Sequence, residues 1–314
     1  MANVVKRIEH YVEPFRVVDG KKFRLKDIDP GDTAGFTSKE QAEEWLAKGV
    51  QWLADLQEKL YADSQWAVLL IFQAMDAAGK DGAIKHVMSG VNPQGCEVYS
   101  FKAPSASELA HDFLWRTIKS LPERGRIGIF NRSYYEDVLV VRVHPELLAK
   151  QRIPPSLVTK DIWKERFEDI NGLERYLARN GVVVRKFFLH VSKKEQKKRF
   201  LSRLEEPEKN WKFSANDATE REYWDAYTEA YEDMIRNTAT NHAPWYVIPA
   251  DNKWFTRLAV AASIVLTLEG LNLEFPKVDA EKHKELEAVR AMLEGKDGNS
   301  RAGALAEHRS AVEG

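Results

Sequence analysis

Residues 66–82 read WAVLLIFQAMDAAGKDG. The first half is a continuous apolar run, which is typical of a strand buried on both faces of a parallel sheet. The second half is a turn in which Ala77, Ala78 and Gly79 let the backbone pass close to a ligand. Lys80 then places a cation beside the exposed N–H groups that begin the next helix. The stretch therefore predicts a strand followed by a phosphate-binding loop.

The loop departs from the pattern G-x-x-x-x-G-K-[ST] at two positions. Ala74 replaces the first glycine, and Asp81 stands where a metal-binding hydroxyl is expected. Asp76 lies inside the turn and can hold hydrated Mg²⁺ directly or through water, which would offset the missing hydroxyl. The alternative interpretation is an ordinary strand-to-helix turn with a surface lysine, in which Asp76 bonds local backbone N–H groups.

Strands and helices alternate along the chain on both sides of this loop. Further strands are predicted over 96–101, 126–131, 182–191 and 245–248, and helices over 38–60, 84–91, 105–121 and 160–179. This alternation predicts an α/β, three-layer fold with a five-stranded parallel sheet and ligands at the carboxyl ends of the strands. The apolar stripe of the 38–60 helix has two possible partners, the sheet of its own chain or a second subunit.

A second polar cluster, FNRSYYED at 130–137, follows the predicted strand 126–131. Arg132 offers a planar fork for phosphate oxygens. Glu136 and Asp137 either position a metal or the attacking group, or hold Arg132 in place. Tyr134 and Tyr135 are expected to pack under the loop.

Residues 192–236 are mostly helical in pattern and highly charged, and we expect them to form a lid. Arg199 and Arg203 are four residues apart, so they share a helix face that can close over an anion. Lys209 and Lys212 extend the row of basic residues that contains Arg199 and Arg203. The alternative is a solvated helix face, which is the usual explanation for a run of charges.

Composition limits the remaining possibilities. The 314 residues, 44% hydrophobic, can bury one large core, which we expect over 1–275. The remainder, 276–314, is expected to contain a charged helix over 277–293 and a disordered tail over 294–314. One cysteine excludes an intrachain disulfide. The histidines are scattered without metal-ligand spacing and are expected to be packing or surface residues.

Charge and hydropathy bear on partners and location. The formal net charge of -1 gives no global attraction to nucleic acid or to an anionic membrane. No apolar signal-peptide core and no bilayer-spanning run occur. We expect a cytoplasmic protein without nucleic-acid or membrane partners.

The three stretches 74–82, 130–137 and 199–214 together resemble the polyphosphate kinase 2 family, over roughly residues 15–270. The resemblance implies a thymidylate-kinase-like P-loop fold, with inorganic polyphosphate as one substrate and a nucleotide as the other. AMP, ADP and ATP are the expected nucleotides, with guanine nucleotides as further candidates. The implied cofactor is Mg²⁺, with Mn²⁺ as the alternative, and a homo-oligomer is expected.

The resemblance also assigns roles to single residues. It makes Asp76 a metal-site acid, with Glu136 compensating for Asn131, which stands where many family members carry aspartate. Asn131 together with Glu136 resembles the branch that accepts both nucleoside mono- and diphosphates. The expected catalytic set is Asp76, Lys80, Asn131, Arg132 and Glu136. The expected polyphosphate- and nucleotide-binding set is Ala77, Ala78, Gly79, Lys80, Asp81, Gly82, Lys85, Arg132, Asp137, Arg199, Arg203, Lys209 and Lys212.

The predicted function is a reversible, polyphosphate-dependent nucleotide phosphotransferase that acts on AMP, ADP or both. Two alternatives remain at this point. One is an ATP-dependent nucleotide kinase. The other is a P-loop protein that binds polyphosphate or nucleotide without turnover, as Asn131 and the absent hydroxyl after Lys80 would allow.

Overall fold

The apolar run of the quoted stretch forms strand β2 (Ala67–Gln73), and all seven of its residues are buried. β4 (Ile127–Asn131) and β5 (Val182–His190) pair with β2 on either side, both parallel to it. β3 (Cys96–Ser100) extends the sheet beyond β4, and β6 (Trp245–Pro249) extends it beyond β5. A strand enclosed on both faces needs this continuous apolar sequence.

The computed structural model describes residues 2–210 and 215–294, and within them one sheet has six strands in the order β1-β6-β5-β2-β4-β3. The five predicted strands are present, and they pair with one another in parallel. The prediction of a five-stranded, all-parallel sheet is nevertheless wrong, because β1 (Arg16–Val17) adds an antiparallel edge strand beside β6. Two paired residues are too short for any periodic pattern to reveal.

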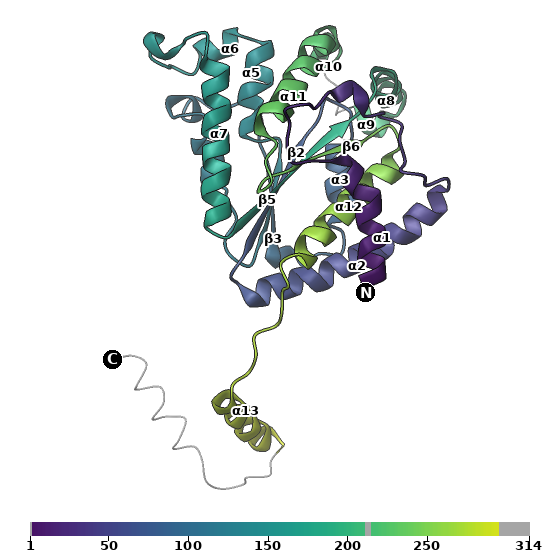
Figure 1. The fold of residues 1–314 in the computed structure, drawn as a ribbon, viewed down its shortest axis with the longest axis vertical. Coiled ribbons are helices and arrows are strands. Elements are labelled where there is room, and N and C mark those ends of the chain that lie inside the picture. The colour runs from purple at the N-terminus through teal and green to yellow at the C-terminus, as the bar shows by residue number, and fades with distance from the viewer. Residues whose placement is uncertain (1, 211–214, 295–314) are drawn as a thin grey trace. The chain divides into compact units, whose positions relative to one another are not determined.

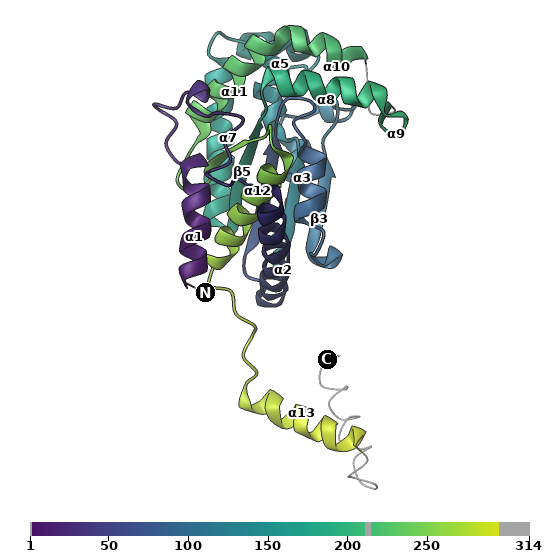
Figure 2. The same cartoon turned by 90° about the vertical axis from the view of Figure 1, so that its right-hand side faces the viewer.

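One face of the sheet is covered by α1 (Ala2–Val12), α2 (Lys39–Asp63), α3 (Lys80–Val87) and α12 (Lys253–Glu269), as Figures 1 and 2 show. The Ser38 hydroxyl caps α2 by accepting from the Gln41 N–H at 3.2 Å. Leu53, Leu56 and Leu60 of α2 are buried in the core on this face. The apolar stripe of α2 is therefore buried within its own chain.

The opposite face carries α7 (Ile162–Arg179), α11 (Trp224–Thr238), α5 (Val140–Val143) and the 3-10 turn η5 (Tyr134–Val138). Side chains alternate between the two cores along each strand. On β2, Leu70 belongs to the first core and Ile71 to the second. The molecule thus has three layers over residues 2–274.

The segment 192–236 is helical, as predicted. It contains α8 (Lys193–Glu205), α9 (Pro207–Asn210), α10 (Ala215–Glu220) and most of α11, while residues 211–214 lie outside the described part of the chain. The remaining elements are short: α4 (Trp115–Ile118), α6 (Glu146–Ala149), and 3-10 turns at Glu13–Phe15, Leu25–Asp27, Pro93–Gly95, Glu108–Ala110, Pro155–Leu157 and Arg221–Tyr223.

The helix predicted over 105–121 is wrong. Ser105 and Glu108 do form the expected capping box, with reciprocal hydrogen bonds of 2.6 and 3.3 Å. The chain then becomes extended at His111, and the Asp112 carboxylate starts a new turn by accepting from the Leu114 N–H at 3.0 Å. A local cap fixed the start of a helix, but a competing aspartate ended it after one turn.

Contacts divide the chain into two units, 1–274 and 275–314. The second unit contains α13 (Ala280–Leu293), which lies within the predicted 277–293 helix and is capped by Asp279, whose carboxylate accepts from the Lys282 N–H at 2.7 Å. Of the predicted tail, 294–314, all but the first residue lie outside the described part of the chain. Across the helices that the structure describes, none has the length and apolar character to cross a bilayer.

Candidate active site

The loop between β2 and α3 has the backbone shape that its small residues permit. Ala77 and Gly79 have positive φ angles of 61° and 107°, a region in which glycine is least strained. α3 begins directly after Gly79, so the N–H groups of its first turn face the loop. The Lys80 ammonium folds back and donates to the Ala74 carbonyl at 2.9 Å. Backbone donors and one cation therefore face the same space.

Arg132 joins the end of β4 to this loop. Its backbone N–H donates to the Phe72 carbonyl at 3.0 Å, and it has a positive φ of 65°. Its Nη2 lies 3.1 Å from Asp76 Oδ1, and its Nη1 lies 3.8 Å from Glu136 Oε2. One guanidinium thus holds a carboxylate from each of the two predicted polar clusters.

The charged groups of Asp76, Lys80, Arg132 and Glu136, which we call the junction, influence the pKa values of one another. Burial lowers the pKa of Lys80, and the nearby Arg132 lowers it further, against the carboxylates of Asp76, Glu136 and Asp81. Burial also raises the pKa of the Glu136 carboxyl, although Arg132 and Lys80 oppose this. An anion that enters between the two cations would relieve their repulsion.

The Asn131 side chain does not point at Arg132. Its Nδ2 donates to Asp81 Oδ1 at 2.8 Å, across the gap between the end of β4 and the start of α3. Asp81 occupies the position after the loop lysine, where a hydroxyl was expected. The amide and the carboxylate that depart from the familiar pattern are thus bonded to each other.

Two cavities open at the carboxyl ends of the strands. The first, which we call the loop cavity, has a volume of about 770 Å³. Its lining includes the basic side chains of Lys80, Lys102, Arg132, Arg199, Arg203, Lys253 and Arg257, and the acidic ones of Asp76 and Asp81. Lys80, Arg132 and Arg203 come from three distant parts of the sequence and line this one cavity.

The second, which we call the aromatic cavity, has a volume of about 560 Å³. Its lining includes the side chains of Phe101, Phe113, Trp224, Tyr227 and Tyr231. The two cavities share Asp76, Phe101, Lys102, Ala103 and Arg132. A strongly basic cavity and one whose lining includes five Phe, Trp and Tyr side chains therefore meet beside Arg132.

The sequence and the fold of this chain are similar to those of known proteins. The model of the family described as polyphosphate kinase 2 matches residues 36–276. The chain belongs to the polyphosphate kinase 2 family. A crystal structure of polyphosphate kinase 2 from Arthrobacter aurescens TC1 superimposes with a TM-score of 0.81 at 41% sequence identity, covering 88% of this chain and 95% of that one.

Two curated polyphosphate kinase 2 relatives align over most of their length. An ADP-polyphosphate phosphotransferase of Rhodopseudomonas palustris is 53% identical over 280 residues, which cover 89% of this chain and 97% of the relative. An AMP/ADP-polyphosphate phosphotransferase of Meiothermus ruber is 46% identical over 274 residues, which cover 87% of this chain and 98% of the relative.

Arg199 of this polyphosphate kinase 2 chain, predicted to share with Arg203 a helix face that closes over an anion, lines the loop cavity but is bonded to the protein itself. It is only 6% exposed. Its guanidinium donates to the carbonyls of Ala77, Ala78, Ala250 and Asp251 at 2.6–3.1 Å, and to Glu195 at 3.0 Å. All five N–H groups are thereby used. Arg199 clamps the loop to α8 and to the end of β6.

The other predicted positions differ in their placement. Arg203 lines the loop cavity. Lys85 is exposed on α3 and is absent from the described lining of either cavity. Asp137 is buried, accepts from Gln151 Nε2 at 2.6 Å and lines the aromatic cavity. Lys209 belongs to α9, and Lys212 lies outside the described residues.

The sequence reasoning missed residues on two elements. Lys253 and Arg257, one turn apart on α12, line the loop cavity. Their signal was available, because α12 follows β6 and the carboxyl ends of parallel strands mark the ligand-binding edge. Gln73 is buried at the end of β2. With its amide in the orientation that satisfies both ends, its nitrogen donates to Glu136 Oε1 at 2.8 Å and its oxygen accepts from the Ser133 N–H at 3.2 Å.

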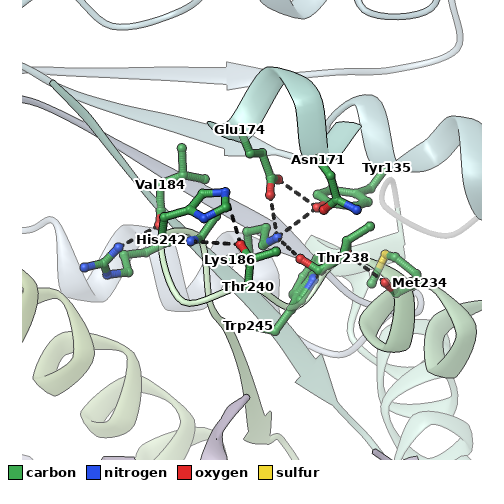
Figure 3. Close-up of polar contacts among 12 residues, drawn as sticks. Tyr135, Asn171, Glu174, Val184, Lys186, Met234, Thr238, Thr240, His242 and Trp245 are labelled. Atoms are coloured by element: carbon green, nitrogen blue, oxygen red, sulfur yellow. Dashed lines mark hydrogen bonds and ion pairs between the residues drawn. The ribbon is translucent and has the colours of Figure 1, made fainter. Parts of the chain in front are cut away.

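A buried polar network lies behind η5 (Figure 3). The Glu174 carboxylate accepts from the hydroxyls of Tyr134 and Tyr135 at 2.9 and 2.7 Å. The Lys186 ammonium donates to Glu174 at 2.6 Å and to the Thr238 carbonyl at 2.7 Å. The side chains of this ion pair have no exposed surface. The two tyrosines are buried, and their hydroxyls tie η5 to Glu174 of α7 and, through Tyr135, to Lys186 of β5.

The carboxylates at the junction suit a hydrated metal ion. Asp76 and Glu136 both contact Arg132 and both line the aromatic cavity. Over the described residues, no group of three or more His, Cys, Asp or Glu side chains could hold an ion. Mg²⁺ commonly keeps several waters and binds through one or two carboxylates together with substrate phosphates. The donors present fit that mode and not an all-protein site.

Proposed function

We propose that this chain transfers the terminal phosphoryl group of inorganic polyphosphate to AMP or ADP, and that the reaction is reversible. Membership of the polyphosphate kinase 2 family and the names of its relatives support this activity. The observation that carries the proposal is that Lys80, Arg132 and Arg203 line one cavity, which meets a second one at Asp76 and Arg132. Transfer between two phosphate chains needs such a meeting point.

The lining of each cavity suggests its substrate. Polyphosphate is a polyanion without a base, and it suits the loop cavity, where seven Lys and Arg residues outnumber two Asp residues. A nucleotide carries an aromatic base, which suits the aromatic cavity, since a base stacks on side chains such as Phe113 or Trp224. The terminal phosphates of both substrates then approach each other beside Arg132.

Phosphoryl transfer demands little covalent chemistry of a protein; it requires placement and neutralised charge. Lys80 and the N–H groups at the start of α3 hold the donor phosphate, and Arg132 bridges the oxygens of donor and acceptor. Arg203 holds the next phosphates of the polymer. Arg199 acts on the loop itself, because its donors are used by loop carbonyls.

The metal in this proposal is Mg²⁺, with Mn²⁺ as a substitute, held by Asp76 and Glu136 through oxygen and water contacts. Bound there, it would offset negative charge on the phosphates as they approach. Asn131 shapes this site indirectly through its bond to Asp81. The strand order and the loop favour assignment to the P-loop kinases.

Several finer points belong to the same proposal. Asn131 and Glu136 favour the branch that accepts both AMP and ADP. ATP is then product or reverse substrate, and guanine nucleotides are further candidates. AMP and ADP as substrates favour a cytoplasmic location. We further propose that residues 192–236 act as a lid over the loop cavity.

The test is an assay of the purified protein with Mg²⁺, long-chain polyphosphate, and either AMP or ADP, followed by nucleotide chromatography. ADP is expected from AMP, and ATP from ADP. A parallel reaction with ATP and AMP but no polyphosphate tests the ordinary nucleotide kinase. Nucleotide binding with no product in any reaction would favour a binding protein and contradict the transferase.

A further inference from the structure

One buried acceptor beside the junction has no partner. In the part of the chain that the structure describes, the buried side-chain nitrogen and oxygen atoms without a hydrogen bond are Asn171 Oδ1 and Gln196 Oε1. Gln196 lines the aromatic cavity, whereas Asn171 lines neither cavity. A buried acceptor without a donor is unfavourable, and folded proteins rarely leave one unless a ligand or water supplies the donor.

The orientation of the Gln196 amide is fixed by its other end. Its Nε2 donates to the backbone carbonyl of Asp76 at 3.0 Å, so the oxygen must face away from that carbonyl. The side chain is 4% exposed and is held on α8, one turn before Arg199. Gln196 therefore contacts the loop at Asp76, whose carboxylate contacts Arg132, and its Oε1 is the acceptor left without a donor.

We propose that Gln196 is a ligand-binding residue of the aromatic cavity, and that its Oε1 accepts a hydrogen bond from an O–H group brought by the ligand. Phosphate oxygens are excluded as partners because they are acceptors at neutral pH. Two O–H sources share the required chemistry: a ribose hydroxyl of a nucleotide, and a water carried by a divalent metal ion. The identity of these ligands rests on the proposed function.

The experiment compares wild type with Gln196→Met, a change of similar length that removes the acceptor. Calorimetry in EDTA measures the affinities of AMP and of 2′,3′-dideoxyadenosine monophosphate for both proteins. Electron paramagnetic resonance measures Mn²⁺ affinity without nucleotide. Gln57→Met, a remote change of another buried glutamine, controls for the general effect of losing a buried amide.

If a ribose hydroxyl is the donor, wild type binds AMP about tenfold more tightly than the dideoxy analogue, and Gln196→Met reduces this ratio to about one. If a metal-bound water is the donor, the nucleotide ratio is the same in both proteins and Mn²⁺ affinity falls about tenfold in the variant. Either result supports the inference, provided that Gln57→Met behaves like wild type.

The inference is overturned if Gln196→Met leaves both the nucleotide ratio and the Mn²⁺ affinity within about twofold of wild type. Wild type that binds neither AMP nor Mn²⁺ would overturn it as well. Since no arm depends on turnover, a wild-type protein that binds these ligands but transfers no phosphate from polyphosphate would contradict the proposed function alone.

Discussion

At the scale of single residues, the junction depends on a strained arginine. Arg132 has a left-handed backbone, which costs a non-glycine residue about 1–2 kcal/mol. Its backbone bond to Phe72 and its ion pair with Asp76 hold it there. The positive φ angle turns the chain out of the strand direction at Arg132, and the guanidinium contacts Asp76 of the loop. Such positions are common where a protein must present a side chain to a ligand.

Lys80→Ala is expected to lower turnover by about two to three orders of magnitude, the scale seen when one preorganised electrostatic contact is lost. Steady-state kinetics with saturating polyphosphate measures the effect. Lys48→Ala, on the exposed face of α2, is the matched control. Near-wild-type turnover in Lys80→Ala would remove this lysine from the mechanism.

His190 is expected to make stability depend on pH. Burial lowers its pKa to about 4, so the folded protein keeps the ring neutral at a pH where the unfolded chain, with a pKa near 6.5, binds a proton. This stability is present above about pH 6.5 and is lost as pH falls toward 4. Between pH 7.5 and pH 5 the loss is about 2 kcal/mol.

Denaturant unfolding at the two pH values tests this dependence. In His190→Asn, the difference in unfolding free energy between them should shrink by about 2 kcal/mol. His283→Asn, at an exposed position of α13, should leave the difference unchanged. Equal differences in wild type and His190→Asn would show that the ring does not cause the pH dependence.

At the scale of elements, η5 is a short turn that is fixed by hydrogen bonds to α7. It carries Glu136 on its cavity side, while Tyr134 and Tyr135 reach back to Glu174 on α7. Lys186 of β5 neutralises that carboxylate, although burial lowers the pKa of the ammonium. Because a turn of five residues has little stability of its own, this network fixes where Glu136 lies.

Lys186→Met is expected to destabilise the fold by about 3–5 kcal/mol, since it leaves Glu174 buried without a counter-charge. Adding Glu174→Gln should recover part of this loss, because the amide still accepts from the tyrosines and carries no charge. Chemical unfolding of both variants checks the prediction. A double variant less stable than Lys186→Met would rule out an unpaired charge as the cause.

The elements also show what sequence can reveal. β2, β4 and β6 were predictable because they are buried apolar runs, whereas β3 and β5 are only partly buried and were placed with the help of the strand–helix alternation. The ends of β2 and β4 located Lys80 and Arg132. The edge strand β1 has only two residues, too few for a sequence pattern to predict it. The helix prediction over 105–121 was wrong because Asp112 starts a new turn soon after the capping box of Ser105 and Glu108. The role of Arg199 depends on carbonyls distant in sequence, which no local pattern encodes.

At the scale of the whole molecule, charge is local. The chain is nearly neutral overall, with 47 basic and 48 acidic residues, yet the loop cavity is strongly basic. A polyanion is then attracted to one opening and little to the rest of the surface. The residues that line both cavities all lie within 1–274, the first of the two contact-defined units.

A chain ending at residue 275 is therefore expected to keep its activity and its thermal stability. The family match ends at 276, and the Meiothermus ruber relative aligns over 98% of its length with 87% of this chain. Assay and thermal unfolding of the shortened protein beside the full chain check this. A fall in turnover of tenfold or more would assign the C-terminal unit a part in catalysis.

The shared lining of the two cavities has a consequence for kinetic order. In the proposed arrangement, polyphosphate and nucleotide lie in adjoining cavities that meet at Arg132, so the phosphoryl group has no need to rest on the protein between donor and acceptor. Both substrates must then be present together. Initial-rate plots would intersect instead of running parallel, and an isotopically chiral donor would yield product of inverted configuration at phosphorus.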